Sequence, residues 1–234
     1  MNAGQITLQS ISGADKFNQW MFETIQPFAH GSILEIGSGI GNISAFFLEQ
    51  KFIITLSDYE DLYLTHLKTK FALFPNLQGV LKIDLEHPDF SNCYTSLTEK
   101  FKTVFLLNVL EHLKDDDMAI ANAKLLLEPN GTLIVLTPSY QFLFCSLDKE
   151  LGHYRRYTLK KLKTIFIKNN FQIKKSFYFN VLGIFGWLYS KIFRLKSISS
   201  NEMRIYNSLT SLGKLLDRLV FKKAGLSAIV IAKK

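Results

Sequence analysis

The chain alternates short apolar runs with segments of helical periodicity, and this alternation limits the fold more than any other feature. The apolar runs occupy residues 32–36, 52–58, 77–84, 103–108 and 132–137. Segments with apolar residues at helical spacing lie at 42–50, 62–71 and 118–127. Regular alternation favours right-handed crossovers and predicts an α/β fold with a Rossmann-like, doubly wound sheet. In such sheets, ligands bind beyond the carboxyl ends of the strands.

Both ends of the chain extend this pattern. A helix is expected over about 12–28, acting either as a lid over a ligand or as a core-packing helix. Thr158 can cap a helix that runs to about Asn169, and strands are expected at 171–179 and 225–232. Between these two strands, residues of about 181–223 are expected to form a helical insertion. A chain of 234 residues fits one domain, spanning 1–234.

A glycine-rich turn joins the first predicted strand to its helix. It contains Gly37, Ser38, Gly39 and Gly41. Glycines let a backbone approach a ligand closely, and the N-terminus of the following helix offers free N–H groups. A dinucleotide-binding turn would place its third glycine at position 42, which is Asn42, so the spacing argues against NAD.

Three carboxylates follow or flank successive strand ends. Glu35 precedes the first glycine by two residues, where it can attract an ammonium or a sulfonium. Asp58 can accept hydrogen bonds from both ribose hydroxyls, and Asp84 one from an adenine amino group, with Leu85 packing on the ring. Taken singly, each acid is more often a helix cap or a surface charge than a ligand-binding group. Together they favour a ligand that combines a nucleoside with a cationic group.

These residues resemble the class I S-adenosylmethionine (SAM) methyltransferases. The motif series comprises the turn from Glu35, Asp58, Asp84, the segment 108–112 and the segment 127–133. Segments 14–20 and 151–158, the latter containing Gly-His-Tyr-Arg-Arg-Tyr-Thr, resemble one bacterial subgroup. The resemblance covers most of the chain and implies a seven-stranded sheet whose last strand is antiparallel.

The resemblance also implies a cofactor, SAM, and its contacts. The methionine portion would meet Glu35 and the glycine turn, the ribose Asp58, and the adenine Asp84 with Leu85. Asn108 would lie beside the methionine and the transferred methyl. The full set of expected cofactor-binding residues is Glu35, Gly37, Ser38, Gly39, Gly41, Asn42, Asp58, Tyr59, Asp84, Leu85, Asn108 and Val109.

Methyl transfer from a sulfonium is an in-line displacement, so positioning and exclusion of water supply most of the catalysis. A hydroxyl acceptor would also need a general base, for which His153 is preferred and His112 is the second candidate. Some quinone-biosynthesis methyltransferases have a Glu-His pair after the fourth strand, like Glu111-His112, and bind a divalent metal. No metal ligand is assigned here, because the acids at 115–117 suit the first turn of a helix.

Tyr154, Arg155 and Arg156 are the expected substrate-binding residues. They lie in a loop predicted over the mouth of the site, where one guanidinium could grip a carboxylate or a phosphate. Alternatively, the arginines pair with Asp148 or Glu150. Adjacent side chains point in different directions, so at most one arginine is expected to meet the substrate.

Charge is distributed unevenly along the chain. Residues 1–152 hold 10 Lys/Arg against 18 Asp/Glu, a net of −8, whereas residues 153–234 hold 18 against 2, a net of +16. Such a basic half favours an anionic partner, although a solvated lysine-rich surface is an equal alternative. The charge-free segment 177–190 is shorter than the roughly 20 residues that span a bilayer.

The insertion carries an apolar helical stripe beside basic residues. The stripe comprises Ile205, Leu209, Leu212, Leu215, Leu216 and Leu219. It suits peripheral contact with an anionic membrane. The alternative is a lid that packs its apolar faces on the sheet. Both hold if the acceptor is lipid-linked.

The sequence therefore predicts a SAM-dependent methyltransferase that acts on a small-molecule or lipid-linked, non-protein acceptor. The alternatives are a non-catalytic SAM-binding scaffold and a nucleic-acid methyltransferase. A nucleic-acid partner is disfavoured, because 108–111 lacks the Asn-Pro-Pro-aromatic sequence typical of base amino methylation. Residues 1–5 do not resemble a secretory signal, and Cys93 and Cys145 are isolated, so a cytoplasmic location is expected, at most peripheral to the inner membrane face.

Overall fold

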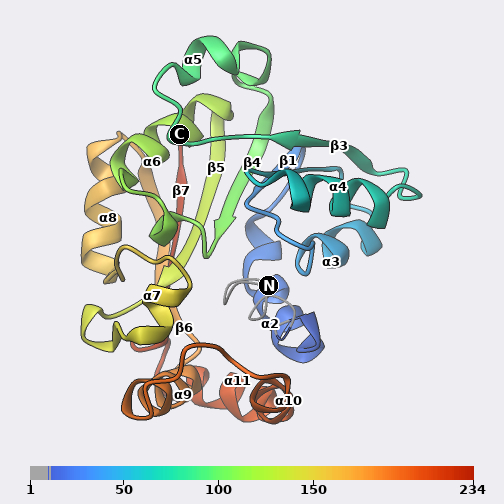
Figure 1. The fold of residues 1–234 in the computed structure, drawn as a ribbon. Coiled ribbons are helices and arrows are strands. Elements are labelled where there is room, and N and C mark those ends of the chain that lie inside the picture. The colour runs from blue at the N-terminus through green and yellow to red at the C-terminus, as the bar shows by residue number, and fades with distance from the viewer. Residues whose placement is uncertain (1–9, 11) are drawn as a thin grey trace.

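A seven-stranded sheet organises the computed structural model, which describes residues 10 and 12–234 (Figure 1). The strand order is β3-β2-β1-β4-β5-β7-β6. The strands are β1 (Ile33–Ile36), β2 (Ile54–Asp58), β3 (Leu77–Lys82), β4 (Phe101–Leu107), β5 (Leu127–Pro138), β6 (Gln172–Phe179) and β7 (Ser227–Lys233). The segment 1–5, on which the signal-sequence expectation rests, lies outside the described residues.

Strand direction follows the expected doubly wound pattern. β1 pairs in parallel with β2 and β4, and the outer pairs β2–β3 and β4–β5 are parallel as well. β7 runs antiparallel to both neighbours, β5 and β6. This confirms the prediction of a final antiparallel strand. The order reverses between β1 and β4, so the ligand crevice is expected at the carboxyl ends of these two strands.

Helices cover both faces of the sheet because successive strand residues point to opposite faces. Ile33 joins the core beneath one helical layer, and its neighbour Leu34 joins the core beneath the other. The first layer is formed by α2 (Asp15–Ile25), α3 (Ser44–Glu49) and α4 (Asp61–Lys70). The second layer is formed by α5 (Phe90–Cys93), α6 (Asp116–Leu126) and α8 (Leu159–Lys168).

Short helical turns complete the connections. They are η1 (Gln26–Phe28), η2 (Thr95–Leu97), η3 (Leu110–His112), η4 (Gln141–Leu143) and α7 (Ser146–Glu150). The predicted N-terminal helix is α2 continued by η1, and Thr158 caps α8 by accepting from the N–H of Lys161 as expected. His112 ends the 3-10 turn η3, which lies before the N-cap of α6 at Asp115.

Two predicted strand details need correction. The third strand ends at Lys82, because its last pairing with β2 joins Lys82 to Asp58, so Asp84 lies in the loop two residues further on. The fifth strand begins at Leu127, five residues earlier than its apolar run. In this early part Leu127 pairs with Phe101 before the register shifts.

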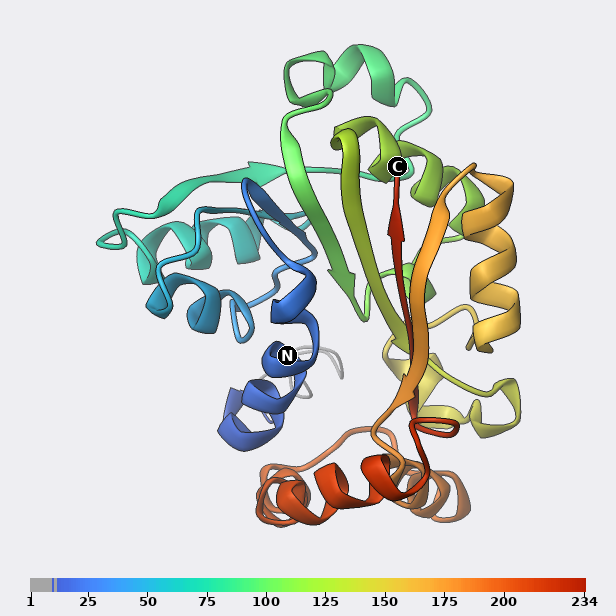
Figure 2. The same cartoon turned by 180° about the vertical axis from the view of Figure 1, so that it is seen from behind.

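The insertion between β6 and β7 forms a separate layer at one end of the sheet, which we call the cap (Figures 1 and 2). It consists of α9 (Leu182–Ile192), α10 (Ser200–Ser208) and α11 (Thr210–Leu219). The N-terminal helix α2 packs on it: the N–H of Phe17 donates to Oδ1 of Asn207 at 3.1 Å. Among the described residues, no helix has the length and apolar content needed to cross a membrane.

Candidate active site

The glycine turn lies at the carboxyl end of β1 in a conformation that requires glycine. Gly37 has φ +73°, and a Cβ there would approach Cγ2 of Val109 to 2.4 Å. Gly41 has φ +76°, and a Cβ there would meet the Phe71 ring at 2.4 Å. Side chains at either position would therefore displace neighbouring atoms as well as strain the backbone.

Glu35 is buried at this turn. Its carboxylate accepts a short hydrogen bond from the hydroxyl of Ser44, and only 4% of the residue is exposed. Burial raises the pKa of Glu35 to about 7, against the opposing effect of the Ser44 and Ser38 hydroxyls. A carboxyl held in this way is ready to ionise when a cation approaches it.

Asp58 is tied to the same turn from β2. Its Oδ2 accepts from the N–H of Gly39 at 2.8 Å, and its Oδ1 accepts from the N–H of Glu60 at 3.0 Å. Burial nevertheless raises the pKa of Asp58. These bonds fix the Asp58 carboxylate beside the glycine turn. Glu35 and Asp58 therefore border the same cavity.

A single cavity of about 960 Å³ connects these groups to the second half of the site. Asp84 lines it and is held by its own loop, because its Oδ1 accepts from the N–H of Glu86 at 2.8 Å. The expected cofactor residues in its wall are Glu35, Gly37, Ser38, Gly39, Asn42, Asp58, Tyr59, Asp84, Leu85, Asn108 and Val109. Gly41 is absent from the wall, and its positive φ and the lack of room for a Cβ beside Phe71 give it a conformational role.

Three residues of the cavity wall, His153, Arg156 and Trp187, are held by Asp148, a fully buried carboxylate on α7 that is not itself in the wall. Its Oδ1 lies 2.9 Å from Nδ1 of His153 and 2.7 Å from Nε of Arg156, while its Oδ2 accepts from Nε1 of Trp187 at 3.1 Å. Burial opposes ionisation, but the bonds from His153 and Arg156 and the charge of Arg156 lower the pKa of Asp148 to about 2. Asp148 is therefore an anion at neutral pH.

An ionised Asp148 fixes the orientation of the His153 ring. A carboxylate can only accept, so Nδ1 of His153 carries the proton in this contact. In the neutral imidazole, Nε2 is then the basic nitrogen, and it lies 4.0 Å from a carboxylate oxygen of Glu111. A histidine with its tautomer set by a carboxylate has the arrangement of a general base.

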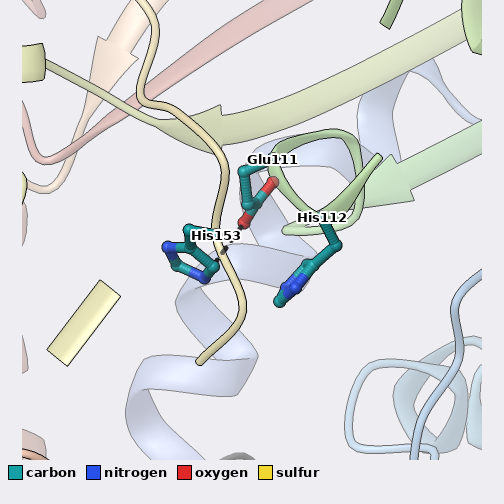
Figure 3. Close-up of side chains that lie close together, drawn as sticks. All are labelled: Glu111, His112 and His153. Atoms are coloured by element: carbon teal, nitrogen blue, oxygen red, sulfur yellow. Dashed lines mark ion pairs between the residues drawn. The ribbon is translucent and has the colours of Figure 1, made fainter. Parts of the chain in front are cut away.

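Glu111 and His112 adjoin His153 from the segment after β4 (Figure 3). The Glu111 carboxylate points toward His153, and the two imidazoles meet edge to face at 4.7 Å between centroids. Both carboxylate oxygens of Glu111 are buried without a hydrogen-bond partner among the described residues. Burial raises the pKa of Glu111 to about 7, and desolvation with the neighbouring His153 lowers the pKa of His112.

The same three side chains offer ligand types suited to a cation. Each residue of the set Glu111, His112 and His153 offers one ligand atom, and these three atoms lie within 4.8 Å of one another. The sequence assigned no metal ligand and considered only Glu111, His112 and the acids at 115–117 together. His153 is 41 positions from His112, and the fold brings it near. The acids at 115–117 behave as expected: Asp115 caps α6 by accepting from the N–H of Met118.

The three expected substrate-binding residues have different environments. Arg156 lines the cavity, stacks 4.4 Å from the Trp187 ring, and leaves its buried Nη2 without a partner among the described residues. Arg155 lies outside the cavity wall and pairs with Asp116 at 3.0 Å. Tyr154 is half exposed and also outside the wall. The pairing of Arg156 with Asp148 matches one of the two alternatives for the arginines.

Sequence reasoning missed three residues of this half of the site: Asp148 as an organiser, Trp187 and Glu111. Asp148 precedes His153 by five residues and Arg156 by eight, spacings that match no regular periodicity. Trp187 comes from the cap, and its contact with Asp148 joins segments 39 positions apart. The sequence identified Glu111 only through its motif and its likeness to a metal-binding Glu-His pair, and did not place it beside His153.

The strand order, the acidic glycine turn and the cavity at the switch point define the fold of SAM-dependent methyltransferases. The chain belongs to the family described as "Methyltransferase domain", whose profile matches residues 15–176. This match covers the glycine turn, the predicted acids and the His153 segment, but not the cap.

Solved structures of methyltransferases have the same fold. A SAM-dependent methyltransferase from Archaeoglobus fulgidus superposes with a TM-score of 0.60 at 16% identity, covering 93% of this chain and 94% of that one. Phosphoethanolamine N-methyltransferase 2 of Haemonchus contortus, bound to SAM, gives a TM-score of 0.59 at 17% identity over 88% of this chain and 49% of that one. These likenesses establish the fold.

The curated relatives are much longer proteins. The probable polyketide synthase 40 of Dictyostelium discoideum is 28% identical over 138 residues, which cover 51% of this chain and 5% of the synthase. The chain therefore corresponds to a small part of that protein, and the activity of the whole synthase is a separate matter.

Proposed function

We propose that this protein transfers a methyl group from SAM to a nucleophilic atom of a non-protein acceptor. One observation carries the proposal: Glu35, Asp58 and Asp84 line the same cavity as His153 and Arg156. The first group suits a cofactor with a nucleoside and an ammonium, and the second suits a polar or anionic acceptor. A single cavity lets donor and acceptor meet.

In the cofactor half, Glu35 pairs with the ammonium of the methionine portion, and the backbone of Gly37 and Gly39 lies against it. Asp58 accepts from the ribose hydroxyls, in a position already set by the Gly39 N–H. Asp84 and Leu85 hold the adenine, and Asn108 with Val109 borders the methyl group.

A small organic acceptor is supported by two kinds of similar protein. One is the phosphoethanolamine methyltransferase bound to SAM, and the other comprises the polyketide synthases.

In the acceptor half, His153 takes a proton from a hydroxyl acceptor through Nε2. The acceptor oxygen attacks the methyl carbon in line, the carbon–sulfur bond breaks, and the electron pair returns to sulfur, leaving S-adenosylhomocysteine. The proton goes to His153, whose imidazolium is stabilised by Asp148. The unpartnered Nη2 of Arg156 supplies a hydrogen bond to an anionic acceptor, either a small molecule or a lipid-linked one.

The closing test is transfer of labelled methyl from SAM into a cell extract, which is then separated into lipid, small-molecule, protein and nucleic-acid fractions. We expect label in the lipid or small-molecule fraction, and its loss with Asp58→Asn. Label confined to protein or nucleic acid would overturn the acceptor class. SAM binding without transfer into any fraction would instead support the scaffold alternative.

We also propose a cytosolic location, supported by the free thiols of Cys93 and Cys145.

A further inference from the structure

Helix α9 of the cap has its amphipathicity inverted. Its inner face, which lines the cavity, carries the small residues Gly183, Gly186 and Ser190 together with Trp187. Several of its large apolar residues are exposed, Phe185 to 64% and Ile192 to 72%, while Leu182, Ile184 and Leu188 are only partly buried. A helix of a water-exposed domain normally buries the face that holds such residues.

Helix α11 repeats the inversion. Its buried positions are Thr210, Gly213 and Asp217, spaced three and four residues apart on one face. The leucines at 212, 215 and 219 lie on the opposite face and are exposed, Leu219 to 63%. The inner face carries small or polar groups because neighbouring segments pack closely against it; a Cβ at Gly213, for example, would come within 3.1 Å of the Trp20 ring.

The cap lies at one end of the molecule (Figures 1 and 2), and the outer faces of its helices therefore present exposed apolar side chains there, which we call the apolar surface. More than half of the large exposed apolar side chains of the described residues lie between positions 185 and 221. Monomeric proteins rarely leave so many apolar side chains together in water, so a partner is expected to cover this surface.

The charged residues around the apolar surface are mainly basic and favour an anionic partner. Exposed basic residues border it at Lys191, Arg194, Arg204, Arg218 and Lys223. The acidic residues of the segment 182–223 are already engaged within the protein. The Asp217 carboxylate accepts from the N–H groups of Asn180 and Val181, and Glu202 caps α10 at Ser199.

We propose that the outer face of the cap docks on an anionic lipid bilayer, with α9 and α11 lying in the plane of the interface. Apolar side chains enter the boundary of the acyl chains while the basic residues meet lipid phosphates. A second copy fits less well, because a two-fold contact would bring basic residues against basic residues. The docking goes beyond methyl transfer, and its test does not depend on activity.

The test is co-sedimentation of the whole chain with vesicles of phosphatidylcholine alone and of phosphatidylcholine mixed equally with phosphatidylglycerol. We expect binding to the mixed vesicles and its decline with added salt. The variant Leu215→Gln with Leu219→Gln should weaken this binding by about tenfold or more, since it removes two side chains from the apolar phase. Arg218→Gln with Lys223→Gln should weaken it and reduce the salt dependence.

Matched controls separate a local from a general effect. Leu73→Gln with Ile167→Gln also removes two exposed apolar side chains, but away from the cap, and should leave vesicle binding unchanged. Lys100→Gln with Lys160→Gln removes two exposed basic side chains away from the cap and should also leave vesicle binding unchanged. Equal binding to neutral vesicles, or equal loss with the controls, would overturn the proposal. The proposal would also be overturned if the protein did not bind vesicles but formed a dimer, and if Leu215→Gln with Leu219→Gln disrupted that dimer.

Discussion

Nδ1 of His153 lies 2.9 Å from Oδ1 of Asp148, and this contact leaves Nε2 as the basic nitrogen of the ring. The pKa of Asp148, about 2, keeps it ionised over the whole range in which enzymes of this kind are assayed. The pair therefore holds the His153 ring in one orientation near neutral pH, as the proposed role of His153 as general base requires.

His153→Gln should lower kcat by about 10²-fold for a hydroxyl acceptor, since it removes the base and keeps a side chain of similar size. The Kd for SAM should change by less than about twofold, because the cofactor half is untouched. The matched control is His66→Gln, an exposed histidine on α4. If kcat of His153→Gln equals that of the unmodified protein at every pH, His153 is not the general base.

SAM binding should depend on pH through Glu35. Its pKa of about 7 in the free protein means that it is largely protonated below pH 7, whereas the bound ammonium requires the carboxylate. Binding then releases a proton, so affinity falls by up to about tenfold per pH unit below 7 and levels off above it. Calorimetry in two buffers of different ionisation enthalpy measures this proton. Glu35→Gln should bind more weakly at pH 8 and lose the pH dependence, and an unchanged dependence in that variant would assign the proton to another group.

Gly37→Ala should abolish most SAM binding, because its Cβ would approach Val109 to 2.4 Å at a φ of +73°. The backbone strain alone costs about 1–2 kcal/mol. The double variant with Val109→Ala should recover only part of the binding, since it removes the clash and leaves the strain. Gly79→Ala in β3 is the control, because a Cβ there would meet no non-neighbouring atom within 4 Å. Full recovery in the double variant would show that strain is unimportant.

Arg156 and Arg155 should differ strongly in their effects on stability. Arg156→Gln leaves the buried carboxylate of Asp148 without its guanidinium and should lower the free energy of unfolding by about 3–5 kcal/mol. Arg155→Gln breaks a partly exposed pair with Asp116 and should cost about 0–1 kcal/mol. Urea unfolding of both variants makes the comparison. Similar costs would mean that the Asp148 network relaxes.

Chelation distinguishes the two uses of the cluster formed by Glu111, His112 and His153. If Nε2 of His153 serves as the base, activity should survive dialysis against a chelator and show no dependence on added Mg²⁺ or Mn²⁺. Activity that is lost on chelation and restored by one of these ions would make the cluster a metal site. Glu111→Gln then provides a second readout, because it should abolish the metal response.

The cofactor half was predictable because its residues lie in order along the chain and its chemistry is local. Gly37 and Glu35 belong to one turn, and Asp58 follows a buried strand, so sequence position and strand order together place them at one edge. Asp84 was assigned to the end of a strand and lies in the following loop. The error has no effect on its access to the cavity, because both positions are beyond the same sheet edge.

The acceptor half depends on contacts that no spacing reveals. Asp148, His153 and Arg156 meet because α7 and the loop after it fold back over the strand ends, and Trp187 reaches them from the cap. Of the adjacent arginines, Arg156 is directed inward and Arg155 outward. Sequence alone could state that at most one would face the substrate, but it could not say which.

The sequence by itself determined the sheet, the glycine turn and the acids that accompany it, because hydrophobic periodicity and glycine conformation are local properties of the chain. It also showed an apolar stripe in the insertion, at Leu212, Leu215 and Leu219. Only the tertiary structure decided that this stripe points away from the protein. The direction of a helix face is set by which neighbours pack against it, and here small residues such as Gly213 occupy the inner face.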